Sequence, residues 1–73
     1  HLFVGDTPAL IPLPGNLDSF VIFICMEGAC VMKDNEGNEL TVNAGESILL
    51  PATTQDVTIT PVGGNVKLLE TYV

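Results

Sequence analysis

Short apolar stretches alternate with polar turns along the chain, and no segment has the 3.6-residue apolar period of an amphipathic helix. Val, Ile and Thr are frequent in these stretches, and Gly, Pro and Asn recur between them, which is typical of strands joined by turns. The pattern predicts strands over residues 19–26, 29–33, 39–42, 47–50, 56–60 and 66–73. Strands of this length and spacing form a sandwich or a small barrel.

The polarity within these strands indicates which side chains face the core. Residues 19–26 (SFVIFICM) are a continuous apolar run, which predicts a central strand covered on both faces. Residues 39–42 and 56–60 alternate instead, so one face of each strand should be buried. The side chains expected to point inward are Leu40, Val42, Val57 and Ile59.

The first eighteen residues are less regular. Pro8, Pro12 and Pro14 each lack a backbone donor, although the stretch around them is apolar. We therefore expect residues 1–18 to form an irregular lead-in that packs across a sheet or onto a neighbouring domain. Residues 19–73 are expected to form the β domain, and the whole chain to be one domain, the C-terminal fragment of a larger protein.

Composition supports the idea of a fragment. Of the 73 residues, 47% are hydrophobic and 15% are charged, whereas soluble domains average about 25% charged residues. The net charge is −7, and Lys33 and Lys67 are the two cations. This balance argues against nucleic acid and against an anionic membrane surface as partners. A small domain with few charges is expected to turn part of its surface toward a partner.

Metal and thiol chemistry have few candidates. His1 is the one histidine, and a zinc site needs three or four ligands within tetrahedral reach. Cys25 and Cys30 are separated by four residues in apolar strands, which differs from the Cys-x-x-Cys spacing. We expect two reduced, buried thiols and a cytoplasmic protein, because no secretory signal or membrane span is evident in this sequence.

Acid–base and nucleophilic sites are equally sparse. Glu27 and Asp56 are acids at strand ends, and the sequence does not bring them together. Ser19 and Ser47 lack the Gly-x-Ser-x-Gly setting of an activated serine. No phosphate loop or dinucleotide fingerprint occurs. We therefore predict no catalytic, cofactor-binding or metal-binding residue in this chain.

Two motifs resemble the cupin family. Glu27-Gly28 matches the "EG" corner of cupins, and residues 45–52 (GESILLPA) match their "GDxxxxPA" stretch. The resemblance implies an all-β fold, a small cupin-like jelly-roll barrel or sandwich of short antiparallel strands. Residues 17–73 are similar, more specifically, to the C-terminal cupin domain of type I mannose-6-phosphate isomerases, and the ending LLETYV is similar to theirs. Those enzymes interconvert mannose 6-phosphate and fructose 6-phosphate with zinc.

The same resemblance shows which cupin residues are missing. A metal-binding cupin has His-x-His and Glu before the corner, and a later His. Here residues 20–26 form apolar strand, and the later position falls at Asp56. The resemblance therefore implies a non-catalytic cupin without a cofactor, inactive alone, with zinc in the catalytic domain of the parent. Its partner would be the rest of the parent chain, through an apolar interface.

Two alternatives stay open. One is a metal-free, sugar-sensing cupin of a regulator, with a small molecule inside the barrel. Its polar contacts would come from Cys25, Thr53, Gln55 and Tyr72. The other is a structural dimerisation module, in which exposed apolar surface drives a homo-oligomer.

Overall fold

The computed structural model describes residues 2–13, 20–51 and 53–72. In these residues the chain forms strands and no helix. The strands in chain order are β1 (Leu2–Gly5), β2 (Ala9–Pro12), β3 (Val21–Glu27), β4 (Ala29–Asp34), β5 (Glu39–Asn43), β6 (Ser47–Leu50), β7 (Asp56–Pro61) and β8 (Val66–Tyr72). The predicted all-β fold of short antiparallel strands is confirmed.

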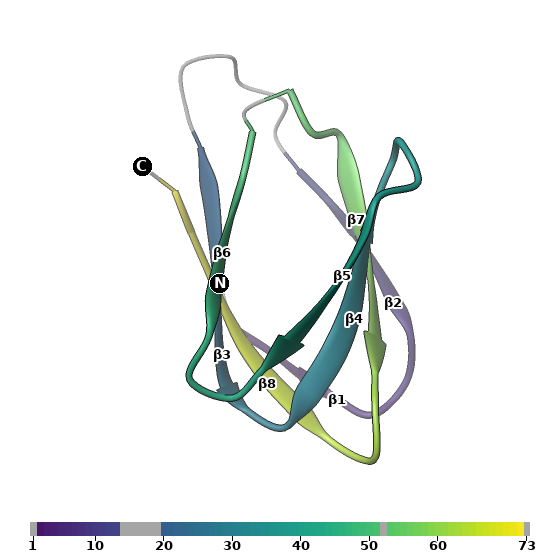
Figure 1. The fold of residues 1–73 in the computed structure, drawn as a ribbon, viewed down its shortest axis with the longest axis vertical. Coiled ribbons are helices and arrows are strands. Elements are labelled where there is room, and N and C mark those ends of the chain that lie inside the picture. The colour runs from purple at the N-terminus through teal and green to yellow at the C-terminus, as the bar shows by residue number, and fades with distance from the viewer. Residues whose placement is uncertain (1, 14–19, 52, 73) are drawn as a thin grey trace.

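The strands make two antiparallel sheets that face each other (Figure 1). Sheet A has the order β1-β8-β3-β6, and sheet B has the order β2-β7-β4-β5. Consecutive strands often lie in opposite sheets, so the chain crosses repeatedly between the layers, as in a jelly roll. The sheets approach each other at the β3–β4 corner and splay apart toward the end of β6 and the start of β7 (Figure 1).

The lead-in is more regular than predicted. β1 pairs with β8 from Leu2↔Leu69 to Gly5↔Val66, and β2 pairs with β7 from Ala9↔Ile59 to Pro12↔Asp56. The expectation of an irregular segment over residues 1–18 is therefore wrong where β1 and β2 lie, while residues 1 and 14–18 are outside the described residues. Pro12 is tolerated because β2 is an edge strand, where one missing backbone donor need not break a ladder.

The predicted central strand is covered on one face rather than two. β3 lies between β8 and β6, and its inward residues Val21, Phe23 and Cys25 are buried. Ile22 and Ile24, on its outward face, are only half-buried. The apolar run was continuous because side chains on both faces of β3 are apolar. Only the inner face is covered by other described parts of the chain.

The core fills the space between the two sheets. Its buried hydrophobic residues are Val21, Phe23, Cys25, Cys30, Met32, Val42, Val57, Ile59, Val66 and Leu68. The predicted inward positions Val42, Val57 and Ile59 are confirmed. Both cysteines lie in this core as free thiols, as predicted. Leu40 is different, because it is about half exposed near the start of its strand.

Candidate functional site

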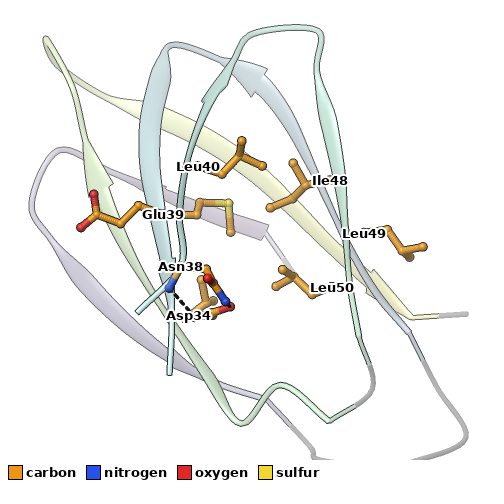
Figure 2. A pocket seen from close by; sticks show the side chains of 9 residues that line it. Asp34, Asn38, Glu39, Leu40, Ile48, Leu49 and Leu50 are labelled. Carbon is orange, nitrogen blue, oxygen red and sulfur yellow. Dashed lines mark hydrogen bonds between the residues drawn. The ribbon is translucent and has the colours of Figure 1, made fainter. Parts of the chain in front are cut away.

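A pocket of about 150 Å³ lies between the two sheets on the side where β5 and β6 form their edges (Figure 2). The residues that line it come from β4, β5, β6, β7 and the β4–β5 turn. They are Met32, Asp34, Asn38, Glu39, Leu40, Ile48, Leu49, Leu50 and Val57. The pocket exists because β5 and β6 leave their connecting turn as the edge strands of different sheets.

Apolar side chains dominate the interior of this pocket. Ile48 and Leu50 point into it from β6, and Leu40 approaches it from β5, whereas Leu49 points away (Figure 2). Leu40 was predicted to face inward beside Val42. It does so, but it stays 53% exposed because it lines the open pocket rather than the closed core.

Asp34 and Asn38, on the polar rim of the pocket, are bonded to each other within the β4–β5 turn. The Asp34 carboxylate accepts hydrogen bonds from the backbone N–H groups of Glu36 and Asn38, both at 2.9 Å. It also accepts one from the side-chain amide of Asn38 at 3.0 Å. These bonds, the Asn38 side chain first, hold the pKa of Asp34 below its usual value, so the group is ionised at neutral pH.

Such a pocket suits a compact apolar group. Its aliphatic lining offers such a group apolar contacts, while the exposure of Leu40 shows that one side is open to water. A sugar seated here would turn some of its hydroxyls toward Ile48, Leu50 and Val57, whose side chains offer them no hydrogen bond.

The residues named for a sugar-sensing site do not line this pocket. Cys25 is in the core, Thr53 and Gln55 are exposed in the loop before β7, and Tyr72 is half exposed. The backbone N–H of Gln55 donates to Asn35 Oδ1 at 2.9 Å, which ties that loop to the β4–β5 turn. The four side chains therefore do not line one common pocket in the described part of the chain.

Glu27 and Asp56 are not brought together. Glu27 ends β3 beside the corner, and Asp56 begins β7 at the opposite end of the molecule (Figure 1). Across the ladders Glu27 faces Lys67, whereas Asp56 faces Pro12. This separation rules out the two carboxylates as an acid–base pair. Ser47 is an exposed residue at the start of β6, and His1 and Ser19 lie outside the described residues.

Both thiols are held in their protonated form. Burial raises the pKa of Cys30 to about 11, with a smaller contribution from Cys25. Burial also raises the pKa of Cys25, whose Sγ lies 3.5 Å from the carbonyl oxygens of Glu27 and Gly28. A nucleophilic cysteine needs a lowered pKa and access to substrate, so neither thiol has that character.

The burial of Thr54 and of Glu70, the two buried polar residues of the described chain, was not predicted. Glu70 is only 6% exposed, on the inward face of β8, and the Tyr72 hydroxyl donates to its Oε2 at 3.0 Å. Burial and this bond raise the pKa of Tyr72. The alternation of Val66, Leu68 and Glu70 in the sequence could have shown that Glu70 faces inward.

The two cupin-like motifs act through the backbone. Gly28 adopts a φ of 77° at the β3–β4 corner, and Gly45 a φ of 89° in the β5–β6 turn. The Gly45 N–H donates to the Cys25 carbonyl, and the Cys25 N–H donates to the Glu46 carbonyl, both at 2.9 Å. The Glu46 side-chain carboxylate accepts a further hydrogen bond, at 2.7 Å, from the Asn43 N–H. The motif residues therefore fasten β3 to the neighbouring turn.

Metal-binding clusters and membrane-spanning helices are both absent from the described part of the chain. Across residues 2–13, 20–51 and 53–72, no three His, Cys, Asp or Glu side chains gather as a metal site would require. Within those ranges there is likewise no helix with the length and apolar character to cross a bilayer.

The comparisons with known proteins agree with the motifs. A family model described as "Mannose-6-phosphate isomerase, cupin domain" matches residues 15–73. Among solved structures, the chain is similar to a cupin-2 domain containing protein from Shewanella frigidimarina NCIMB 400, with a TM-score of 0.63 and 18% sequence identity. That match covers 92% of this chain and 63% of the other, and at such low identity it shows the fold alone. Curated protein sequences gave no significant match.

Proposed function

The chain belongs to the family of mannose-6-phosphate isomerase cupin domains, and from this membership we propose that it is a non-catalytic companion domain. In this role it packs against a catalytic domain that binds zinc and interconverts mannose 6-phosphate and fructose 6-phosphate. It contributes stability and position to that domain rather than reacting groups. We assign the parent enzyme to the cytoplasm, where free thiols such as those of Cys25 and Cys30 stay reduced.

One observation carries this proposal. The strand before the corner, where a metal-binding cupin has its first ligands, turns Val21, Phe23 and Cys25 into the core. None of these three side chains is the histidine or glutamate that such a cupin uses there. The position of the later histidine falls at Asp56, at the far end of the molecule from the corner (Figure 1). The close packing of the strand before the corner supports a role in which that strand binds no metal.

The sugar-sensing alternative has less support. The pocket between β5 and β6 is lined mainly by aliphatic side chains, and its carboxylate at Asp34 is bonded within its own turn. Sugar sites need several convergent polar groups that are free to bond the ligand. The three hydrogen bonds that Asp34 already accepts leave that carboxylate little capacity for a ligand.

The proposal is tested by zinc titration and by activity. We expect the 73-residue chain to bind no zinc and to leave mannose 6-phosphate unchanged. The isomerase polypeptide that carries it should bind zinc and isomerise mannose 6-phosphate. We also expect that polypeptide to keep its zinc but unfold at lower temperature when residues 1–73 are deleted. Tight zinc binding or isomerisation by the chain alone, or an unchanged unfolding temperature after the deletion, would overturn the proposal.

A further inference from the structure

We propose that the open edge of β6, together with the pocket behind it, binds an extended peptide strand that has alternating aliphatic side chains and basic residues at its ends. The proposal goes beyond the companion role, which assigns no ligand to the pocket. Its two components, a free strand edge and an apolar pocket, are adjacent in the fold.

The edge of β6 has backbone groups that no described strand pairs with. β6 is the last strand in the order β1-β8-β3-β6, so within the described residues only β3 forms a ladder with it. Hydrogen-bonded and non-hydrogen-bonded residue pairs alternate along an antiparallel ladder. The Cys25 N–H donates to the Glu46 carbonyl, so the next bonded pair is at Ile48. The backbone N–H and C=O groups of Ser47 and Leu49 therefore point away from β3, toward the open edge.

β6 also lacks the charges, prolines and bulges that usually keep a sheet edge from pairing. Its sequence is SILL, and its ladder with β3 has no register shift. Pro51 follows only after the strand has ended. The edge of β5, across the pocket, instead carries Glu39 beside Lys33. Of the two edges that border the pocket, β6 is therefore the one that accepts a strand.

The pocket lies directly behind this edge. Ile48 and Leu50 point into it from β6, and Leu40 approaches it from β5 (Figure 2). These side chains stay partly exposed, whereas Phe23 and Val21, the ladder partners of Ile48 and Leu50, are at most 3% exposed. A strand added to β6 would turn every second side chain toward the pocket, because side chains alternate between the faces of a sheet. The aliphatic lining favours aliphatic residues at those positions.

The charge around the pocket favours a basic strand. Asp34 lines the pocket, and its hydrogen bonds come from neutral amide groups, which do not cancel its negative charge. Glu39 lines the pocket as well, with the Lys33 ammonium 3.9 Å from its carboxylate. The whole chain adds to the negative potential with a net charge of −7. Complementary charge speeds association and selects the partner, so lysine or arginine at the ends of the strand suits this site.

A second copy of the chain fits the site less well. Its β6 has no charged side chain, and its own Ile48 and Leu50 already line its own pocket. Pairing of β6 with β6 would thus join two edges without filling either pocket. An edge of four residues extends over only about 13 Å. Such an edge alone falls short of the roughly 800 Å² per partner that a stable interface buries.

Three synthetic peptides, acetylated and amidated at their ends, test the chemistry of the ligand. KTVTITK has both features, KTSTSTK lacks the aliphatic side chains, and ETVTITE reverses the charge. Each is titrated into the 73-residue chain, and the dissociation constant is measured by calorimetry. We expect KTVTITK to bind about tenfold more tightly than either control. Equal binding of either control, or no binding of KTVTITK, would overturn the proposal.

Hydrogen exchange of backbone amides, followed by NMR, locates the bound peptide. With saturating KTVTITK, we expect the amides of Ser47 and Leu49 to exchange about tenfold more slowly, because they then donate to the added strand. By the same alternation the amides of Glu39 and Thr41 face the open edge of β5, and they should not change. Slower exchange at Glu39 and Thr41 instead would overturn the proposal. Slowing at Ser47 and Leu49 without peptide, rising with chain concentration, would assign the edge to a second copy and overturn it too.

Matched variants separate the edge from the pocket. Leu49→Pro removes an N–H from the open edge, whereas Leu49→Ala keeps it, so only the first should weaken KTVTITK binding, by about fivefold. Leu40→Ser removes a side chain from the pocket and should also weaken binding about fivefold. Leu10→Ser, at a position 63% exposed on sheet B, should leave it unchanged. Thermal unfolding checks that each variant folds, and Leu40→Ser decides the test where Leu49→Pro does not. Equal effects within the decisive pair would overturn the proposal.

Discussion

Replacement of Gly28 by alanine tests why the corner between β3 and β4 carries a glycine. Gly28 has a φ of 77°, and a Cβ added there would collide with the Asn65 carbonyl oxygen and lie 3.2 Å from Val66 Cα. Both obstacles are backbone atoms at the start of β8, where Val66 pairs with Gly5 of β1 and the next residue, Lys67, pairs with Glu27 of β3. Gly37, in the β4–β5 turn, has a φ of 90°, but a Cβ added there would meet nothing within 4 Å. It is therefore a matched control for the backbone conformation alone.

The two costs can be estimated separately. A left-handed conformation costs a non-glycine residue about 1–2 kcal/mol, and this applies to both variants. Forcing an extra methyl group against fixed backbone adds about 1–3 kcal/mol, and this applies to Gly28→Ala alone. For a domain of this size, each kcal/mol lowers the melting temperature by about 4–8 °C. Gly28→Ala should therefore melt at least about 4 °C below Gly37→Ala, and both should melt below the unchanged chain.

Thermal unfolding followed by circular dichroism measures this difference. Sulfate can be added to all samples to keep the weakest variant folded, because excluded salts strengthen burial. Equal melting temperatures for the two variants would refute the argument, since the contact with Asn65 would then carry no cost. A Gly37→Ala variant that is less stable than Gly28→Ala would refute it as well.

Three further outcomes follow from the pocket rim, the thiols and the core. The pKa of Asp34 is lowered in the folded chain, so its contribution to stability is present above its ordinary value of 3.8 and is lost as the pH falls through the lowered value. The melting temperature of the unchanged chain should thus fall more steeply below about pH 4 than that of Asp34→Asn, and parallel curves would contradict this. Cys30, with its pKa raised to about 11, should resist a thiol reagent at about pH 8 until urea unfolds the chain, and rapid labelling of the folded chain would show that the burial is wrong. Ile59→Ala, in the core, should lower the free energy of unfolding by about 2–5 kcal/mol in urea titrations. Leu49→Ala, at a position that is 60% exposed, should lower it by less than about 1 kcal/mol. A loss for Ile59→Ala as small as that for Leu49→Ala would place Ile59 outside the core.

Most of the strands could be predicted because their cause is local. The stretch 47–50 matches β6, and the alternation around Val57 and Ile59 correctly indicated which side chains enter the core. β1 and β2 could not be read in the same way. Each strand is short, and it exists because it pairs with β8 or β7, which lie far away in the sequence. Because of the prolines around β2, an irregular segment was predicted there. An edge strand, however, tolerates proline.

The pocket could not be predicted for a related reason. Its volume depends on how far the edges of β5 and β6 diverge, and no local pattern in the sequence encodes that angle. The pairing of Tyr72 with Glu70 was within reach, because residues two apart in a strand share a face. The role of Gly28 was predicted in kind, as a corner residue. The carbonyl of Asn65 that enforces glycine there is visible only in the folded chain.

The few charged residues of the two sheets follow one rule. On sheet B, Lys33 and Glu39 are ladder partners, and their charged groups lie 3.9 Å apart. On sheet A, Lys67 and Glu27 are ladder partners as well, although the rows beside them are mainly aliphatic. Other acids of the described residues lie at turns and strand ends, as at Asp34, Glu36 and Glu46. Each lysine thus lies opposite an acid, which is the arrangement that stabilises cross-strand pairs, because opposite charges attract and like charges repel at that separation.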